Sequence, residues 1–314
     1  MTTGTGTAAF AGFAIESARN TRTAPNRWLP ILQESLACEQ TFLRSAGLNG
    51  GRRFATRKTA GQKAVSGSVS MELQAQTIAS LLRACLGGTV VTTGSGPFTH
   101  TIAGGALPTA TWQVLRPFAM NTTLQAFDYV GAMVNSWTIT QNPNEFGQLQ
   151  VEVFAWDEVT NQTAGTYAPA ATITPLTFQN VTITTPDGAV CFNSFTLTGN
   201  NGLEQSFKSC ANDAGRAMIR EAGMRSVTGT LSGDFTALTA YSRYLAGTEG
   251  TLTIAYNAGA SAQLTFTMNV YYTGETPNVD GPRVVQQGIP FEVISATSDA
   301  NAITAVLINS DATA

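Results

Sequence analysis

The sequence contains few charged residues. Asp, Glu, Lys and Arg make up 12% of its 314 residues, whereas an average soluble domain has about 25%. Disordered chains combine low hydrophobicity with high net charge, but here 43% of the residues are hydrophobic and the net charge is −3. A pI of about 5.2 argues against a basic nucleic-acid-binding protein. A surface made of neutral hydroxyl and amide groups repels its neighbours weakly, and this favours association.

Histidine and cysteine are also scarce. His100 is the single histidine, so two-histidine zinc sites and H-E-x-x-H motifs are excluded, and a Ser-His-Asp triad is disfavoured. Its neighbours alternate in polarity as in a strand, and we interpret it as a polar-face residue, not a catalytic one. Cys85 lies on an apolar helix face and is expected in the core. The wide spacing of the cysteines predicts reduced thiols and folding in a cytoplasm; they are Cys38, Cys85, Cys191 and Cys210.

Long apolar runs and nucleotide-binding motifs are missing as well. No stretch approaches 18 apolar residues and no basic segment leads into an apolar one at the start, so we expect neither a membrane span nor a signal peptide. No P-loop sequence occurs. Because no catalytic, cofactor-binding or metal-binding constellation is present, the sequence does not predict an enzyme.

An internal repeat is the main positive feature. Residues 65–73 (VSGSVSMEL) recur as residues 227–235 (VTGTLSGDF), at an offset of 162. Glu39-Gln-Thr-Phe42 recurs as Glu204-Gln-Ser-Phe207, at an offset of 165. Two matches in the same order at nearly the same offset indicate a duplicated domain. Duplication also explains why Glu39 and Glu204 are matched, without invoking a catalytic carboxylate pair.

Each copy of the longer repeat leads into a helical pattern. In the first copy, apolar residues recur at helical spacing and Gly87-Gly88 ends the helix; these residues are Ile78, Leu81, Leu82, Cys85 and Leu86. In the second copy a similar stripe ends at Gly247 and consists of Phe235, Leu238, Tyr241 and Leu245. Arg83 and Arg243 occupy comparable places and are expected on the polar faces.

Alternating polarity predicts the strands. Residues 148–154 and 263–270 alternate with a period of two, which is typical of antiparallel strands with one buried face. Residues 141–147 predict a turn that pairs the first of these with the strand of Trp137 and Ile139. The expected fold class is mainly β, with two tandem β-sandwich or half-barrel domains, each flanked by an α-helix. We place the domains at residues 1–157 and 172–314, with a linker at residues 158–171.

Charge is divided unequally between the halves. Residues 1–157 hold 11 Lys or Arg against 8 Asp or Glu, a net charge of +3, whereas residues 158–314 hold 6 against 12, a net charge of −6. Residues 44–63 contain no acidic residue and are expected to form a long basic loop or hairpin tip. This segment is a solvated loop, a contact that docks on an acidic surface, or a phosphate-binding site. Its basic residues are Arg44, Arg52, Arg53, Arg57, Lys58 and Lys63.

The order and spacing of several segments resemble the tail tube proteins of phages with long, non-contractile tails. The resemblance covers most of the chain, except about the first twenty residues and the linker, and no single segment is diagnostic. The segments are 65–73 with the following helix, 98–102, 129–139, 193–204, 225–231 and 277–282.

This resemblance implies a structural virion protein of the tail, assembled in the host cytoplasm. Such proteins form rings, usually of six domains, whose sheets join into an inner β-barrel. The rings stack into a tube around a tape-measure protein, between tail-tip and terminator proteins, and genome DNA later passes through the lumen without sequence-specific binding.

Two expectations are specific to this chain. If each half is one tube domain, three chains complete a ring as a homotrimer with pseudo-sixfold symmetry. The six basic residues of segment 44–63 are then expected to contact the acidic side of the next ring, away from a net acidic lumen wall.

A competing interpretation is a capsid decoration protein or a carbohydrate-binding adhesion protein made of two β-sandwiches. That class would present an exposed platform of Trp or Tyr side chains. The four tryptophans are instead spread along or beside apolar strands, which favours core positions; they are Trp28, Trp112, Trp137 and Trp156.

Overall fold

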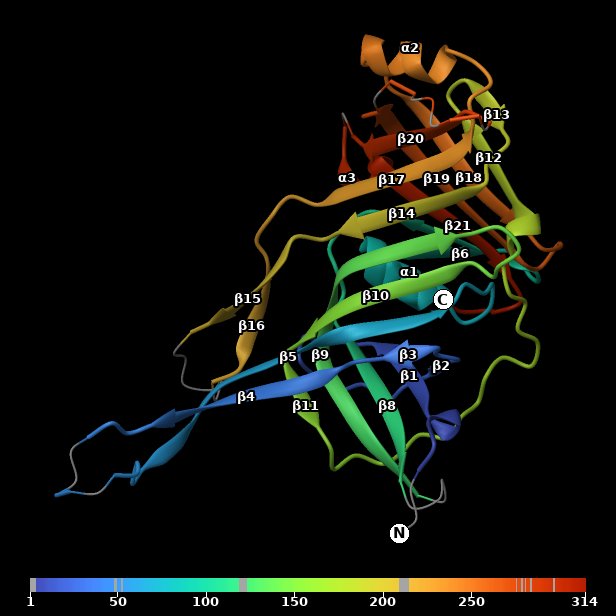
Figure 1. The fold of residues 1–314 in the computed structure, drawn as a ribbon. Coiled ribbons are helices and arrows are strands. Elements are labelled where there is room, and N and C mark those ends of the chain that lie inside the picture. Colours follow the sequence, from blue (N-terminus) through green and yellow to red (C-terminus); the bar gives the residue numbers. More distant parts are fainter. Residues whose placement is uncertain are drawn as a thin grey trace.

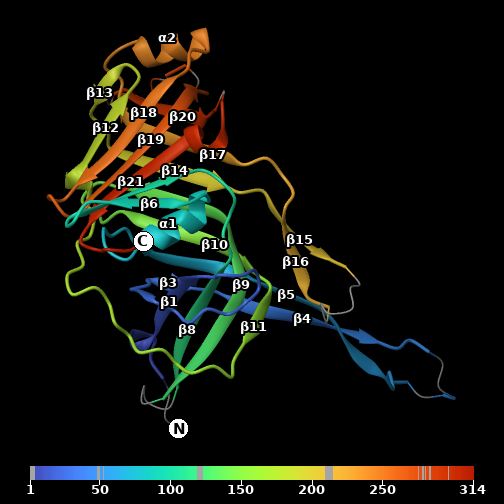
Figure 2. The ribbon, with the colours of Figure 1, turned by 180° about the vertical axis from the view of Figure 1, so that it is seen from behind.

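The chain folds into a mainly β molecule with one long hairpin extending to the side (Figures 1 and 2). In Figure 1 the first half lies below and the second half above, and the N-terminus lies at the lower end. The computed structural model describes residues 4–47, 50–51, 53–118, 123–208, 215–274, 276–277, 279, 281–282, 284–295 and 297–314.

The first half contains one short helix among strands, as the sequence predicts. Its elements are η1 (Gly6–Ala8), β1 (Phe10–Ile15), β2 (Arg27–Leu29), β3 (Gln33–Glu34), β4 (Ala37–Arg44), β5 (Lys58–Glu72), α1 (Ala79–Leu86), β6 (Val90–Thr93), β7 (Phe98–Ala103), β8 (Ala110–Phe118), β9 (Thr123–Gln141), β10 (Gln148–Ala155) and β11 (Asp157–Val159).

The second half has a similar order of elements. They are η2 (Phe178–Asn180), β12 (Val181–Thr185), β13 (Gly188–Val190), β14 (Ser194–Asn200), β15 (Leu203–Phe207), β16 (Ala217–Glu221), β17 (Ser226–Asp234), α2 (Thr239–Ala246), β18 (Gly250–Asn257), β19 (Gln263–Tyr272), β20 (Gln286–Val293), α3 (Asp299–Ala302) and β21 (Ile303–Asn309).

The predicted strands and hairpin are confirmed. β9 and β10 form the expected antiparallel hairpin, with Thr140 opposite Gln148. The buried residues of β10 and of β19 alternate with more exposed ones, because one face of each strand packs into the core. None of the helices in the described part of the chain has the length and apolarity that crossing a membrane requires.

The two halves share a continuous sheet. β9 of the first half pairs with β14 of the second, from Gln141 opposite Phe195 to Ser136 opposite Asn200. β7 of the first half also pairs with β21 of the second. One hydrophobic cluster contains buried residues of both halves, including Val151 and Leu264. The halves are therefore packed on each other by strand pairing and by apolar contact, while β11 occupies the first two residues of the expected linker.

A glycine permits the close approach of the two halves. Gly199 of β14 lies opposite Trp137 of β9, and a Cβ atom at Gly199 would lie 2.2 Å from the indole ring. Trp137 is itself 3% exposed and held in the core. Because a buried ring cannot move aside cheaply, the seam between the halves requires a residue without a side chain at this position.

The two repeated helices differ in burial, which the sequence did not predict. α1 ends at Gly87, whose φ of 83° suits glycine, and seven of its eight residues are buried. α2 also ends at its expected glycine, Gly247, but none of its residues is buried. Ala240 and Tyr244 of α2 are half-buried against the core. Two residues of its predicted apolar stripe, Leu238 and Leu245, are exposed in the described part of the chain.

The expectation for His100 was wrong in one respect. His100 lies in strand β7, as predicted, but its side chain is completely buried instead of lying on a polar face. Its Nδ1 lies 2.9 Å from Thr92 Oγ1 on β6, and its Nε2 lies 3.0 Å from Asn309 Oδ1 on β21. Polar side chains of the two neighbouring strands satisfy the ring, so its burial costs little.

Candidate assembly surfaces

The long arm is the hairpin of residues 37–63, formed by β4 and the first part of β5. It projects away from the body (Figures 1 and 2), and none of its described residues is buried. An isolated two-stranded hairpin is marginally stable in water. Its length and exposure therefore suit a segment that another molecule covers.

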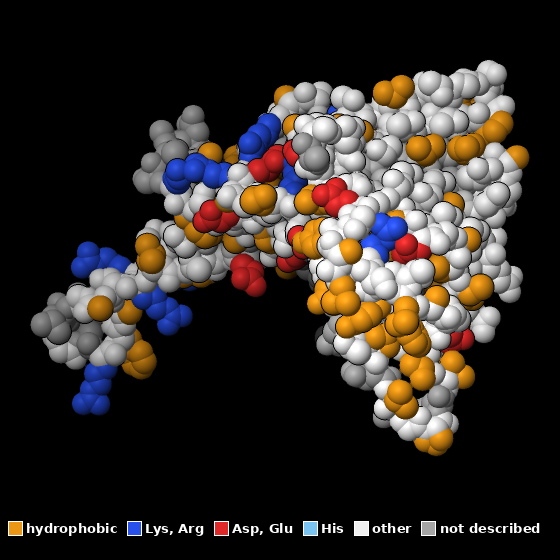
Figure 3. Space-filling view, turned by 90° about the horizontal axis from the view of Figure 1, so that it is seen from above, with side chains coloured by type: hydrophobic (Ala, Val, Ile, Leu, Met, Phe, Trp, Pro, Cys, Tyr) orange, Lys and Arg blue, Asp and Glu red, His pale blue; other side chains and the backbone are white. Residues whose placement is uncertain are grey.

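The structure brings four of the predicted basic residues together on the outer part of the arm. Arg44 lies opposite Lys58 in the strand register, and Arg53 and Arg57 lie exposed in the connection between the strands. Figure 3 shows blue Lys and Arg side chains along this part of the arm. Arg52, the fifth predicted residue, lies outside the described residues. The arm therefore presents a concentrated positive charge.

Exposed apolar side chains, which the sequence pattern alone did not single out, accompany these charges. Phe42, Leu43 and Phe54 are 58%, 62% and 87% exposed. Lys58 Nζ lies 5.4 Å from the centre of the Phe42 ring, in a cation–π arrangement. In the sequence Phe54 directly follows two arginines. This neighbouring of an aromatic residue and two cations could have indicated a mixed apolar and basic surface. A surface that combines large apolar groups with cations fits a protein partner better than a purely solvated loop.

Lys63, the sixth predicted residue, has a different place at the base of the arm. Its Nζ donates to a carboxylate oxygen of Asp157, and the other oxygen accepts from Arg216 Nε at 2.7 Å. The Arg216 guanidinium also lies over the Trp156 ring, 4.6 Å from its centre. Lys63 is thus part of an ion cluster that joins both halves of the chain, and it does not belong to the exposed charge of the tip.

This cluster controls the protonation of Asp157. Burial by itself raises the pKa of the Asp157 carboxyl, but hydrogen bonds and charges from Arg216 and Lys63 outweigh that effect and hold the pKa below its usual value. A carboxyl with a depressed folded-state pKa stabilises the fold above its unfolded pKa, about 3.9, and this contribution is lost as the pH falls through the folded pKa.

Asp157→Asn should therefore lower the free energy of unfolding by about 1–3 kcal/mol at pH 7, because the two cations lose their shared partner. The difference from wild type should shrink as the pH falls below about 4, where the carboxyl of the unfolded chain takes up a proton, and should vanish once the pH is below the lower folded-state pKa. Urea denaturation at pH 7, 5 and 3 measures both effects. Glu221→Gln, which removes the more exposed ion pair with Arg225, should change stability by under about 1 kcal/mol. A constant difference at all three pH values would contradict this assignment.

A second, shorter hairpin supports the base of the long arm. It consists of β15 and β16 and carries the second copy of the shorter repeat, so Glu39 and Glu204 are each exposed on a different hairpin. Gln205 Nε2 donates to Val65 O at 2.9 Å, and Lys63 N donates to Gly215 O at 2.8 Å. The repeat thus marks the first strands of two hairpins, one long and one short, through the similar segments 39–42 and 204–207.

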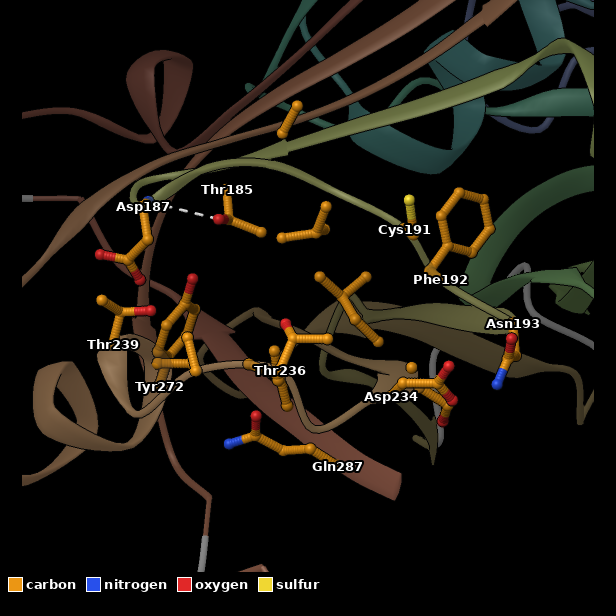
Figure 4. A pocket seen from close by; sticks show the side chains of 18 residues that line it. Thr185, Asp187, Cys191, Phe192, Asn193, Asp234, Thr236, Thr239, Tyr272 and Gln287 are labelled. Atoms are coloured by element: carbon orange, nitrogen blue, oxygen red, sulfur yellow. Dashed lines mark hydrogen bonds between the residues drawn. The ribbon is translucent and has the colours of Figure 1, made fainter. Parts of the chain in front are cut away.

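The structure also contains an open pocket beside α2, with a volume of about 330 Å³ (Figure 4). Thr185 and Asp187 of the β12–β13 hairpin lie on one side, and the exposed Cys191 and the Tyr272 ring contribute to the wall. These groups do not make a nucleophile–base pair. Over the described residues, no group of three or more His, Cys, Asp or Glu side chains could hold a metal ion.

The tryptophans do not form a sugar-binding platform. Trp28, Trp112 and Trp137 are 7%, 1% and 3% exposed, which confirms their predicted core positions. Trp156 is half-buried beneath Arg216. These four side chains therefore do not form the exposed aromatic surface that a carbohydrate-binding protein would present.

Comparison with known proteins points to a protein that assembles with others, as the exposed arm suggests. No curated protein matches the chain. A family model described as phage tail tube protein matches residues 6–293, which is most of the sequence. The match includes the long arm, the shorter hairpin of β15 and β16, both repeated helices and the seam between the halves. The chain therefore belongs to the phage tail tube protein family and has a structural role in the phage tail.

Proposed function

We propose that this chain polymerises into stacked rings that form the tail tube, through which genome DNA passes into the host cell. Each half, residues 1–157 and 172–314 with the linker 158–171 between them, supplies one tube domain. Three chains then complete a ring with pseudo-sixfold symmetry. The tape-measure protein occupies the tube during assembly, and tip and terminator proteins bound its length.

The observation that carries this proposal is the seam between the halves. β9 pairs with β14 across it, so one domain already joins the next through strand edges within the chain. β5 and β17 are the two copies of the repeated strand. β3 pairs with β5 as β14 pairs with β17, so β3 is the counterpart of β14. In the described part of the chain, however, β3 pairs with β5 alone. An unpaired edge invites another strand, and ring closure would pair it.

The long arm supplies the contact between rings. Its exposed basic tip reaches away from the body, whereas the second half carries a net charge of −6. Opposite charges on two stacked surfaces guide docking and fix its orientation. A net acidic chain is also suited to a lumen along which DNA must slide without being held.

Electron microscopy of the purified protein tests this function. We expect tubes or stacked rings whose averaged cross-section shows six similar domains but only three complete chains. A ring density that contains six complete chains would contradict the duplicated-domain arrangement. Compact single particles at all protein and salt concentrations would contradict polymerisation itself.

A further inference from the structure

α1 and α2 occupy the same position in the internal repeat. Each follows the repeated strand, β5 or β17, and an offset of 160 aligns Arg83 with Arg243 and Gly87 with Gly247. The two arginines share one contact, although Arg243 also pairs with Asp187. Arg83 Nε donates to Gly88 O at 3.1 Å, and Arg243 Nη1 donates to Glu249 O at 3.3 Å, just beyond the end of each helix.

The same alignment reveals opposite environments. Ile78, before α1, is 0% exposed, whereas its counterpart Leu238 is 63% exposed. Cys85 within α1 is 1% exposed, whereas its counterpart Leu245 is 67% exposed. Apolar residues thus stand at matching positions of both helices, but within the described chain these positions are buried only in α1, although Ala240 and Tyr244 of α2 pack against the core.

Part of the cover over α1 comes from the other half of the chain. Asn201 Nδ2 donates to Cys85 O at 3.0 Å, and Arg225 Nη1 lies 3.5 Å from Leu86 O, at the C-terminal end of the helix. Asn309 Nδ2 donates to Ala75 O at 2.8 Å, in the segment that leads into α1. α1 therefore marks an interface between a first and a second half.

α2 lies at the end of the molecule that points away from the first half (Figures 1 and 2). The pocket of Figure 4 opens beside it, and Val284, in the segment before β20, is 70% exposed. Figure 3 views the molecule from this end and shows hydrophobic side chains gathered in patches. The exposed Leu238 and Leu245 are thus part of a broader exposed surface at this end of the described chain.

We infer that the first half of a second copy of this chain covers α2, as the second half of its own chain covers α1. The inference rests on the proposed ring. It names both surfaces of the contact: α2 of one copy and the first half of the next. A partner that is another copy is favoured because this chain already contains one complete example of the same interface, built from the same repeat.

The repeat also identifies the partner residue. At the offset of 162, Lys63 stands where Arg225 stands, two residues before the repeated Val-Ser/Thr-Gly-Ser/Thr sequence. Lys63 Nζ contacts Asp157 and, at 3.5 Å, Glu158 O. An ammonium has three donors, so one remains for the C-terminal carbonyls of α2 in the other copy.

Hydrogen–deuterium exchange and mutation of α2 test this interface. In wild-type protein, the amides of residues 239–246 should gain protection when rings or tubes assemble. Leu238→Ser combined with Leu245→Ser should leave the monomer folded, because both side chains are exposed, yet raise the protein concentration needed for assembly by about tenfold or more. Leu238→Met combined with Leu245→Met keeps the apolar surface and should assemble like wild type.

The outcomes separate this inference from the proposed function. Wild-type tubes in which α2 gains no protection, together with normal assembly of the double serine variant, would overturn the inference and leave the tube intact. A wild-type protein that forms neither rings nor tubes would overturn both. Equal assembly defects in the serine and methionine variants would also count against it, because a loss of apolar contact cannot explain them.

Discussion

A variant in which Arg52, Arg53, Arg57 and Lys58 are all replaced by glutamine should remain folded but fail to form long tubes. The described members of this set are exposed on the arm, so their replacement leaves the core unchanged. Even at about 1 kcal/mol per lost charge, four charges alter the association constant by about a thousandfold. Sedimentation and negative-stain microscopy would show the defect, and circular dichroism would show the retained fold.

A charge-preserving variant is the matched control. Replacing the three arginines by lysine and Lys58 by arginine retains the net charge and should retain most of the assembly. Raising the ionic strength should weaken wild-type assembly in the same direction as the glutamine variant, because salt screens exposed charges. Tubes of normal length and salt resistance from the glutamine variant would show that the arm is a solvated loop.

The sequence was most informative where local pattern decides structure. Alternating polarity predicted β10 and β19 because a half-buried strand requires it, and Gly87 predicted the end of α1 because the backbone there has a positive φ. The basic segment was also predicted to be a loop or hairpin tip. In the structure β4 and β5 pair up to Arg44 opposite Lys58, so the residues between these two form the tip.

Partners distant in the chain could not be predicted. The polarity around His100 suggested an exposed face. In the structure the ring is buried, and its Nε2 forms a hydrogen bond with Oδ1 of Asn309, more than 200 residues later in the chain. Lys63 looked like one member of a basic cluster until Asp157 and Arg216 placed it in an ion cluster. In each case the tertiary neighbour, which no local pattern contains, determines the role of the residue.

The repeated helices illustrate the same limit most clearly. Periodicity identifies an apolar stripe on both α1 and α2, but it does not say what covers the stripe. The duplication supplied the missing comparison, because it gives each α2 position a counterpart in α1 whose environment is known. A helix buried within its own chain and a helix buried against another chain both carry apolar residues at helical spacing. The structure distinguishes the two cases because it shows which residues are exposed in the single chain.

That distinction predicts contrasting effects of one substitution at two matched positions. Cys85→Lys should prevent folding or lower the free energy of unfolding by about 5 kcal/mol or more, because an ammonium would replace a thiol that is 1% exposed in an apolar core. This loss is comparable with the whole stability of a typical domain, about 5–15 kcal/mol. Soluble yield and urea denaturation measure it, with Cys85→Ala as a milder control at the same site.

Leu245→Lys, at the matching position of α2, should change the stability of the monomer by under about 1 kcal/mol. Leu245 is 67% exposed, and a cation near the C-terminal end of a helix is electrostatically favourable. The same variant should nevertheless assemble poorly, since the lysine would enter an apolar contact between chains. A Leu245→Lys protein that unfolds like Cys85→Lys would show that α2 is held within the monomer, and one that assembles normally would place α2 outside the subunit interface.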